Sequence, residues 1–337
     1  MLAGRARQSA ASRCRVNRDP LLEVRGISVT LQSGGRVVRA VRDCTLHLYG
    51  GEVLALVGES GSGKTTLARA IAGIVPFDRG ELHFRSQQLL AVPPVVRRSL
   101  RRRIQMVFQD SDASLNPMHR IGAILAEPLT VIRFGDRSAI RDRVTELLAM
   151  VRLDASLIDK RPRQLSGGEK QRIAIARALA MEPELLIADE PLSSLDVSTQ
   201  ATIAALFRDL QRRLNIGLLF ISHDLAAVRQ LADRVAVMHA GEIVETGSCG
   251  AVLDTPAHPY TRLLLAAMPD LRRRVLDVHL VDAIDRLAPL THQPPACHYR
   301  PHCIRRAEIC VNSAELAQVA ADRDHLARCH FRDERPP

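Results

Sequence analysis

The sequence is poor in aromatic residues and has no long apolar run. Aromatic side chains make up 3% of the 337 residues, and tryptophan is absent. Proteins that bind single-stranded nucleic acid without sequence preference rely on stacked aromatic rings, so the chain has few of the residues that this class needs. A membrane-spanning helix needs about 18 or more consecutive apolar residues, and no stretch approaches that length. We therefore expect that the chain does not span a membrane.

Acidic residues are outnumbered: 47 Lys and Arg stand against 37 Asp and Glu, a formal net charge of +10. Arginines cluster at 5–18, at 97–98 with 101–103, and at 272–274. Such clusters can bind nucleic acid or anionic lipid, but most are solvated faces, which we favour here. No nucleic-acid partner is expected. Residues 1–18 contain no acidic side chain, and residues 1–20 are expected to form a disordered basic tail, with a misassigned start as the alternative. They lack the apolar core of a secretion signal.

Residues 58–65 read GESGSGKT and match the phosphate-binding pattern G-x-x-x-x-G-K-[ST]. The apolar run 53–57 before them suits a buried strand, and residues 67–71 after them suit a helix. The glycines let successive backbone N–H groups turn toward a phosphate, Lys64 would reach the β- and γ-phosphate oxygens, and Thr65 would offer its hydroxyl to Mg²⁺. The predicted nucleotide-binding residues of this loop are Gly58, Glu59, Ser60, Gly61, Ser62, Gly63, Lys64, Thr65 and Thr66.

A second apolar strand ends in two carboxylates, in the sequence LLIADE at 185–190. In enzymes with a phosphate-binding loop, a carboxylate at such a strand end holds Mg²⁺ and a neighbouring one can orient the attacking water. We predict that Asp189 lies on the metal side and that Glu190 is the general base.

Six phrases in this order resemble the ATP-binding subunit of an ABC transporter. They are GESGSGKT, MVFQD with Gln109, LSGGEKQR at 165–172, LLIADEP, SSLD ending at Asp196, and ISHD with His223. Their number and order over residues 58–224 make the resemblance very specific. It implies an ATPase that binds ATP and Mg²⁺ and hydrolyses ATP to drive the transport of a solute.

The resemblance also implies roles for individual residues. In the family, two such domains enclose two ATP molecules, each lying between the phosphate-binding loop of one subunit and the LSGG phrase of the other. Ser166, Gly167 and Gly168 would thus bind the partner's nucleotide, which suits their place before the helical pattern at 173–179, where free N–H groups favour an anion. Gln109 would sense Mg²⁺ and the attacking water, and His223 would hydrogen-bond the γ-phosphate. Asp196, at the end of SSLD, is also predicted to bind the nucleotide.

One position departs from the family pattern. Family members often carry an aromatic residue near the end of the first strand, on which adenine stacks. The segment 22–31 places Leu31 or a neighbour there, and stacking on an aliphatic side chain is weaker. Tyr49 or a residue of another loop is the alternative.

The expected fold is α/β, a P-loop NTPase core with a mostly parallel sheet covered on both faces. Strands are predicted at 185–189, 218–222 and 234–238. Apolar spacing at 121–129 and 140–151 predicts helices within an inserted helical subdomain at about 110–164. The predicted domains are the ATP-binding domain, 21–250, and a small C-terminal cysteine-containing extension, 251–337.

Two phrases narrow the resemblance. DTPAHPYTRLL at 254–264 and SDASLNP at 111–117 are similar to segments in the ATPases of oligopeptide, dipeptide and nickel importers. This implies a peripheral subunit on the cytoplasmic face of the bacterial inner membrane, energising import of peptides or a related solute such as a nickel chelate. The implied partners are a second ATPase subunit, identical or different, two transmembrane permease subunits and an extracytoplasmic solute-binding protein. The alternative is a soluble ABC ATPase acting on nucleic acid or ribosomes, but those usually carry two cores or a long coiled-coil insertion.

Four of the seven cysteines fall in the last part of the chain, at Cys297, Cys303, Cys310 and Cys329. The pattern resembles the cysteine-rich tail of peptide-importer ATPases. Four thiolates can hold a [4Fe–4S] cluster or a tetrahedral Zn²⁺, whereas the third alternative is unliganded thiols. The spacing lacks a C-x-x-C element, and we favour the cluster. Cys14, Cys44 and Cys249 are isolated and expected to be inert.

Overall fold

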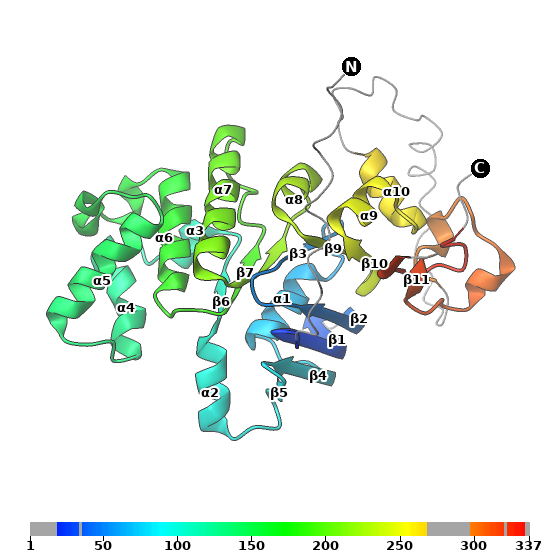
Figure 1. Cartoon of the computed structure of the whole chain (residues 1–337), viewed down its shortest axis with the longest axis horizontal. Helices are drawn as coiled ribbons and strands as arrows, with labels where there is room; N and C mark the ends of the chain where they lie inside the picture. The colour runs from blue at the N-terminus through cyan, green and yellow to red at the C-terminus, as the bar shows by residue number, and fades with distance from the viewer. Residues whose placement is uncertain (1–18, 34–35, 268–296, 320–321, 334–337) are drawn as a thin grey trace, which may run out of the picture.

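The structure is a computed structural model that describes residues 19–33, 36–267, 297–319 and 322–333 (Figure 1). The predicted basic tail lies outside the described residues up to residue 18. The same holds for Cys14 and for the arginines at 5–18 and 272–274.

An eight-stranded sheet has the strand order β11-β12-β10-β9-β3-β8-β7-β6. Its strands are β3 (Val53–Val57), β6 (Ile104–Val107), β7 (Leu185–Asp189), β8 (Gly217–Ile221), β9 (Arg234–His239), β10 (Glu242–Ser248), β11 (Ala317–Val319) and β12 (Asp322–Ala327). The five strands from β9 to β6 are parallel, and the remaining three are antiparallel. Every residue of β3, β7 and β8 is buried, which explains their unbroken apolar sequences. The three predicted core strands are confirmed.

A separate antiparallel sheet, ordered β2-β1-β4-β5, was not predicted. It consists of β1 (Leu22–Ser33), β2 (Arg36–Leu48), β4 (Arg79–Phe84) and β5 (Gln87–Gln88). The description "mostly parallel" therefore holds for the core and not for the whole fold. The sequence does contain a signal for this hairpin, because Gly34-Gly35 separates two runs rich in β-branched residues.

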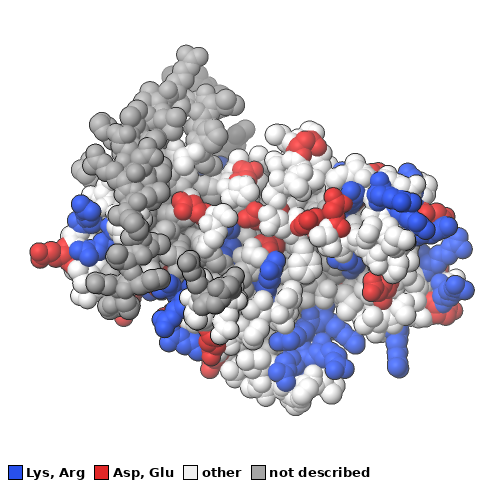
Figure 2. All heavy atoms as spheres, turned by 180° about the vertical axis from the view of Figure 1, so that it is seen from behind, with Lys and Arg blue, Asp and Glu red and all other residues white. Residues whose placement is uncertain are grey.

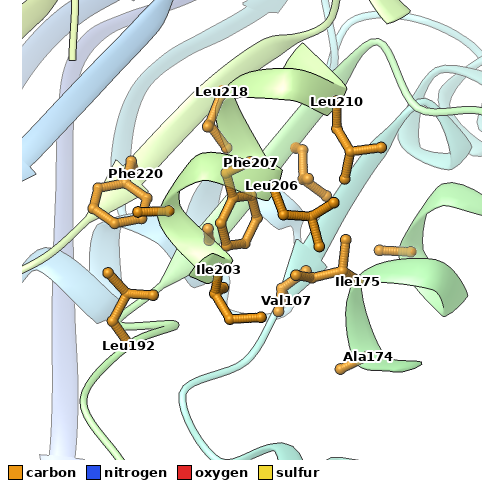
Figure 3. Close-up of a cluster of buried hydrophobic side chains, with 14 of the residues drawn as sticks. Val107, Ala174, Ile175, Leu192, Ile203, Leu206, Phe207, Leu210, Leu218 and Phe220 are labelled. Carbon is orange, nitrogen blue, oxygen red and sulfur yellow. The ribbon is translucent and has the colours of Figure 1, made fainter. Parts of the chain in front are cut away.

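Two hydrophobic cores lie on the two faces of the central sheet. On one face α7 (Val197–Leu214) packs against β8, with the Phe207 and Phe220 rings edge to face at 6.1 Å between centroids (Figure 3). On the other face α1 (Lys64–Ala72) and the antiparallel sheet enclose buried Leu56, Leu67 and Phe84. The central strands are therefore covered on both sides, as expected.

The helical region between β6 and β7 projects to one side of the core (Figure 1). It contains α3 (Ser111–Ser114), α4 (Ile121–Val131), α5 (Arg137–Met150), α6 (Gly167–Leu179) and the 3₁₀ turns Ala155–Asp159 and Pro162–Gln164. The two predicted helices are present. The second begins earlier than its apolar spacing indicated, because Asp136 caps it by accepting the N–H of Ala139.

The remaining helices are α2 (Pro94–Arg102), α8 (Leu225–Leu231), α9 (Cys249–Asp254), α10 (Pro259–Ala266) and two 3₁₀ turns, Arg300–His302 and Glu308–Val311. Strand β12 of the C-terminal extension pairs with β10, so the described part of the extension continues the central sheet. Within the described ranges, none of these helices has the length and apolar character to cross a membrane.

Candidate nucleotide site

The phosphate-binding loop connects β3 to α1 and depends on glycine at two close contacts. At Gly58, a Cβ atom would lie 2.1 Å from the carbonyl oxygen of Met238, and at Gly63 it would lie 2.2 Å from that of Ala40. Gly63 also has φ 105°, which strongly favours glycine. Larger residues would therefore push the loop off β9 and β2.

Lys64 is buried at the start of α1 and points back into the loop. Its Nζ donates to the carbonyl oxygens of Gly58 at 2.8 Å and Glu59 at 2.7 Å. Burial lowers the pKa of Lys64, while the nearby carboxylates of Glu190 and Asp189 act in the opposite direction. An anion entering the loop would therefore meet a lysine that is already partly stripped of water.

Thr65 and Asp189 join the loop to the end of β7. The Thr65 hydroxyl donates to Oδ1 of Asp189 at 3.0 Å. Asp189 is buried, which raises the pKa of its carboxyl group, and the bond from Thr65 lowers it. Oxygen ligands of this kind suit Mg²⁺, which in phosphoryl-transfer sites takes few protein ligands beside phosphates and water. A cluster of three or more acidic or histidine ligands is not required for such a site, and none occurs in the described part of the chain.

The side chains of Gln109 and His223, both predicted site residues, contact the carboxylate of Glu190, the predicted base. The amide nitrogen of Gln109 donates to Oε2 of Glu190 at 3.3 Å, and Nδ1 of His223 lies 3.3 Å from the same oxygen. Glu190 has φ 45°, an uncommon backbone conformation for this residue type. Its N–H donates to the carbonyl of Ile221 at 3.0 Å, which holds it in place beside β8. A carboxylate held between an amide and an imidazole can accept a proton from water.

The LSGG phrase forms the start of α6, as predicted. The Ser166 hydroxyl accepts the N–H of Glu169 at 3.3 Å, while the Glu169 carboxylate accepts the N–H of Ser166 at 2.8 Å. This reciprocal pair is a capping box. Ser166 and Gly168 line a hollow of about 430 Å³ whose other lining residues are Arg152, Leu153, Asp154, Leu157, Glu169, Arg172 and Thr199. No residue of the phosphate-binding loop lines it.

Asp196 caps α7. Its carboxylate accepts the N–H of Thr199 at 2.9 Å and the hydroxyls of Ser198 and Thr199 at 2.6 and 2.7 Å. These bonds hold the pKa of Asp196 well below its usual range. Within one chain, Asp196 thus orders the first turn of α7.

The two candidates for adenine stacking occupy different places. Leu31 lies in β1 opposite Val38 of β2. Val38 stands two residues before Ala40, whose carbonyl lies against Gly63 of the phosphate-binding loop, so Leu31 is near that loop. Tyr49 lies between β2 and β3 and therefore at the opposite end of β3 from the loop, with its ring against His47. Tyr49 is not placed to stack on a base above this loop.

One contact of the phosphate-binding loop could not be predicted from the sequence. The hydroxyl of Tyr260, at the start of α10, accepts the backbone N–H of Glu59 at 3.0 Å. The phrase around Tyr260 resembled a subfamily segment, but nothing in its pattern indicated a contact 201 residues away.

The four C-terminal cysteines line one small pocket together with His258, Tyr299 and Phe331. All four are free thiols. Burial raises the pKa of Cys297 and Cys329 and raises that of Cys303 to about 11. Partly buried thiols of this kind are protonated at neutral pH unless a cation compensates the thiolate charge.

The groups around these sulfur atoms decide how well the four cysteines suit a metal ion or an iron–sulfur cluster. Backbone N–H groups form hydrogen bonds with three of the thiols: that of Tyr299 with Cys297, that of Arg305 with Cys303, and that of Phe331 with Cys329. These bonds lower the pKa of each thiol, whereas burial raises it. Such bonds favour a thiolate, so the donor set suits a thiolate-bound metal in its chemistry. In the ranges that the structure describes, however, no three cysteines, histidines or carboxylates stand at the spacing of metal ligands. The iron–sulfur cluster stays a prediction.

The other cysteines behave as isolated residues in the described ranges. Cys44 is buried, which raises its pKa to about 12, and Cys249 is partly exposed on α9. A thiol with so high a pKa is a poor nucleophile.

The arginines of α2 and the residue after it lie at the surface. None of the nine residues of α2 is buried. Figure 2 shows Lys and Arg side chains gathered at the lower edge of the molecule, where α2 projects in Figure 1. Arg103 pairs with Glu184, Arg98 and Arg102 are exposed, and the half-buried Arg101 lies against Gly73.

Comparison with known proteins places this geometry in a family. Residues 41–193 match the family described as ABC transporter, and residues 244–310 match the one described as Oligopeptide/dipeptide transporter, C-terminal region. The oligopeptide transport ATP-binding protein OppF of Escherichia coli K12 is 44% identical over 274 residues, covering 80% of this chain and 81% of its own. OppF of Haemophilus influenzae is 39% identical over 324 residues, covering 93% and 97%.

Solved structures agree with the fold. A dimeric ATP-binding cassette in a post-hydrolysis state, bound to ADP and Pi, has a TM-score of 0.61 and 28% identity, covering 68% of this chain and 98% of that one. The cbiO1 protein of Clostridium perfringens, part of the ABC transporter complex cbiONQ, has a TM-score of 0.62 and 29% identity, covering 71% and 92%. From its motifs, its fold and its relatives, the chain belongs to the ATP-binding subunits of ABC transporters, in the branch that carries the oligopeptide/dipeptide transporter C-terminal region.

Proposed function

We propose that the chain hydrolyses ATP to power the import of peptides through a membrane transporter. The observation that carries the ATPase assignment is the convergence of Gln109 and His223 on Glu190, beside the bond between Thr65 and Asp189. The relatives include oligopeptide transport and glutathione import ATP-binding proteins, which supports peptides as the solute class.

In this proposal Lys64 and those N–H groups of the phosphate-binding loop that have no partner within the protein bind the phosphates of ATP. Thr65 and Asp189 would hold Mg²⁺, which neutralises charge on the phosphate oxygens when bound. Glu190 orients the attacking water and accepts its proton, while Gln109 and His223 keep the carboxylate aimed at the γ-phosphate. The base of ATP would lie against aliphatic side chains near Leu31.

We infer that this chain pairs with a second ATPase subunit and completes the nucleotide site of that subunit. Ser166, Gly167 and Gly168 lie at a capped helix N-terminus with a hollow beside it, a setting that favours an anion. We infer that they bind the nucleotide held by the other subunit, with Asp196 near the contact between subunits. Two permease subunits and a solute-binding protein would complete the importer, and this chain would lie at the cytoplasmic face of the membrane.

The test is reconstitution in vesicles with candidate permease and binding-protein subunits. ATP hydrolysis should rise when the binding protein carries peptide, and should not respond to DNA or RNA at physiological salt, since weak phosphate contacts are lost as salt increases. Strong, saturable stimulation by nucleic acid without the membrane subunits would favour the soluble ATPase instead.

A further inference from the structure

A side chain of the C-terminal extension, that of Tyr260, contacts the phosphate-binding loop. Tyr260 is buried, with 1% of its surface exposed, and its hydroxyl accepts the N–H of Glu59 at 3.0 Å. Glu59 is the second residue of the loop. A loop residue with no strand or helix partner must find an acceptor for its N–H elsewhere, and here the extension supplies it.

The other side of Glu59 holds Lys64. The Glu59 carbonyl accepts Lys64 Nζ at 2.7 Å and the Ser62 N–H at 3.2 Å. The residue is therefore tied to Tyr260 through its N–H and to the lysine through its carbonyl. A shift of Glu59 would move the oxygen that holds the Lys64 ammonium group.

Tyr260 is itself held by a buried network of hydrogen bonds. The Glu245 carboxylate, fully buried, accepts the N–H groups of Ala257 and His258 at 2.8 and 2.9 Å. Nε2 of His325, on β12, lies 2.7 Å from the same carboxylate. The His258 ring in turn accepts the Tyr260 N–H at 3.1 Å and caps α10. Each bond fixes the turn that carries the tyrosine.

Ring contacts fix the direction of the Tyr260 side chain. Its ring lies 4.2 Å from that of His239 on β9 and 5.6 Å from that of Tyr299, between centroids. Tyr299 belongs to the pocket of the C-terminal cysteines. The tyrosine hydroxyl is therefore held at a defined position before any nucleotide arrives, which limits the ordering that binding requires.

We propose that Tyr260 is a positioning residue of the nucleotide site, which acts on the phosphates of ATP through Glu59 and Lys64. The inference rests on the proposed function, since it assumes that the loop binds ATP. In this role Tyr260 keeps the loop in its binding conformation, and it does not contact the reacting atoms.

The test is Tyr260→Phe in the full chain, which removes the hydroxyl and keeps the ring contacts. ATP affinity, measured by titration of the purified chain, should weaken about five- to tenfold, the effect expected for one lost hydrogen bond. In the assembled transporter, KM for ATP should rise while kcat stays within about twofold, because Glu190 is untouched. Amide exchange at Glu59 should become faster. Tyr49→Phe makes the same chemical change at the far end of β3 and should alter none of these values.

A second variant tests the network behind the tyrosine. Glu245→Gln keeps one acceptor for the turn and loses the charge, so it should weaken ATP affinity in the same direction. Wild-type affinity and wild-type amide exchange in Tyr260→Phe would overturn the inference alone. A wild-type chain that binds no ATP would overturn the proposed function, and the inference with it.

Discussion

Thr65 donates its hydroxyl to Asp189 across 124 residues of sequence, at 3.0 Å. The bond brings the first turn of α1 against the end of β7, so two oxygens that suit Mg²⁺ lie side by side. A hydroxyl and a carboxylate already in contact need little rearrangement to accept a metal between them and a phosphate.

Replacing Thr65 by Val should therefore weaken the Mg²⁺ dependence of the site. The Mg²⁺ concentration for half-maximal ATP hydrolysis should rise by about tenfold, since one of few protein ligands is lost and the shape is kept. Thr145→Val, on the exposed face of α5, is the matched control. An unchanged Mg²⁺ titration in Thr65→Val would contradict the assignment.

Glu190→Gln should abolish hydrolysis and leave ATP binding intact. The amide cannot accept the proton of the attacking water, and removal of a positioned base is expected to cost on the order of 10²-fold or more in turnover. Size-exclusion chromatography with ATP should show the variant accumulating as a closed dimer. Glu182→Gln, at an exposed carboxylate, is the control, and near-normal turnover by Glu190→Gln would remove Glu190 from the role of base.

Acid should destabilise the turn before α10. Burial first, and the nearby His239 and Arg262, lower the pKa of His258 to about 3. The unfolded chain, with an ordinary histidine pKa, takes up a proton as the pH falls below about 6.5, whereas the folded chain does not until about 3. Stability is therefore fully present above about pH 6.5 and falls by roughly 2 kcal/mol by about pH 5.

Urea unfolding at a series of pH values measures this effect. His258→Asn keeps a side chain that can cap α10 but cannot take up a proton, so its stability should change less between pH 7 and pH 5. His239, with a pKa lowered to about 4 by burial, His298 and His302, contributes in the same direction, so some dependence should remain in the variant. An equal slope in both proteins would show that His258 is not responsible.

The cysteine pocket predicts the metal content of the protein. If its four thiolates hold one [4Fe–4S] cluster, anaerobically purified protein should be brown, with about four iron atoms per chain. Cys303→Ser should lower the iron content by more than half, and Cys249→Ser should not. One zinc atom per chain would indicate a structural zinc site in place of the cluster. A metal-free protein with an ordered extension would indicate that the four cysteines are ordinary thiols.

The sequence predicted the catalytic core better than its surroundings. Glu190, His223 and Gln109 follow short apolar strands of one parallel sheet, and the carboxyl ends of such strands share an edge, so their proximity could be foreseen. The contact between Tyr260 and Glu59 could not, because it depends on how the extension folds back. The antiparallel sheet was missed because its strands carry no chemical motif, and only alternation and the Gly34-Gly35 pair indicate it.

The pairing of β12 with β10 has a consequence for synthesis. Thr246 of β10 lies opposite Leu326, so this side of β10 cannot pair with β12 until residues 322–327 have left the ribosome. An unpaired strand edge is a template for association with other chains. A chain that ends before residue 322 would carry that open edge permanently, and it should aggregate even with every catalytic residue in place.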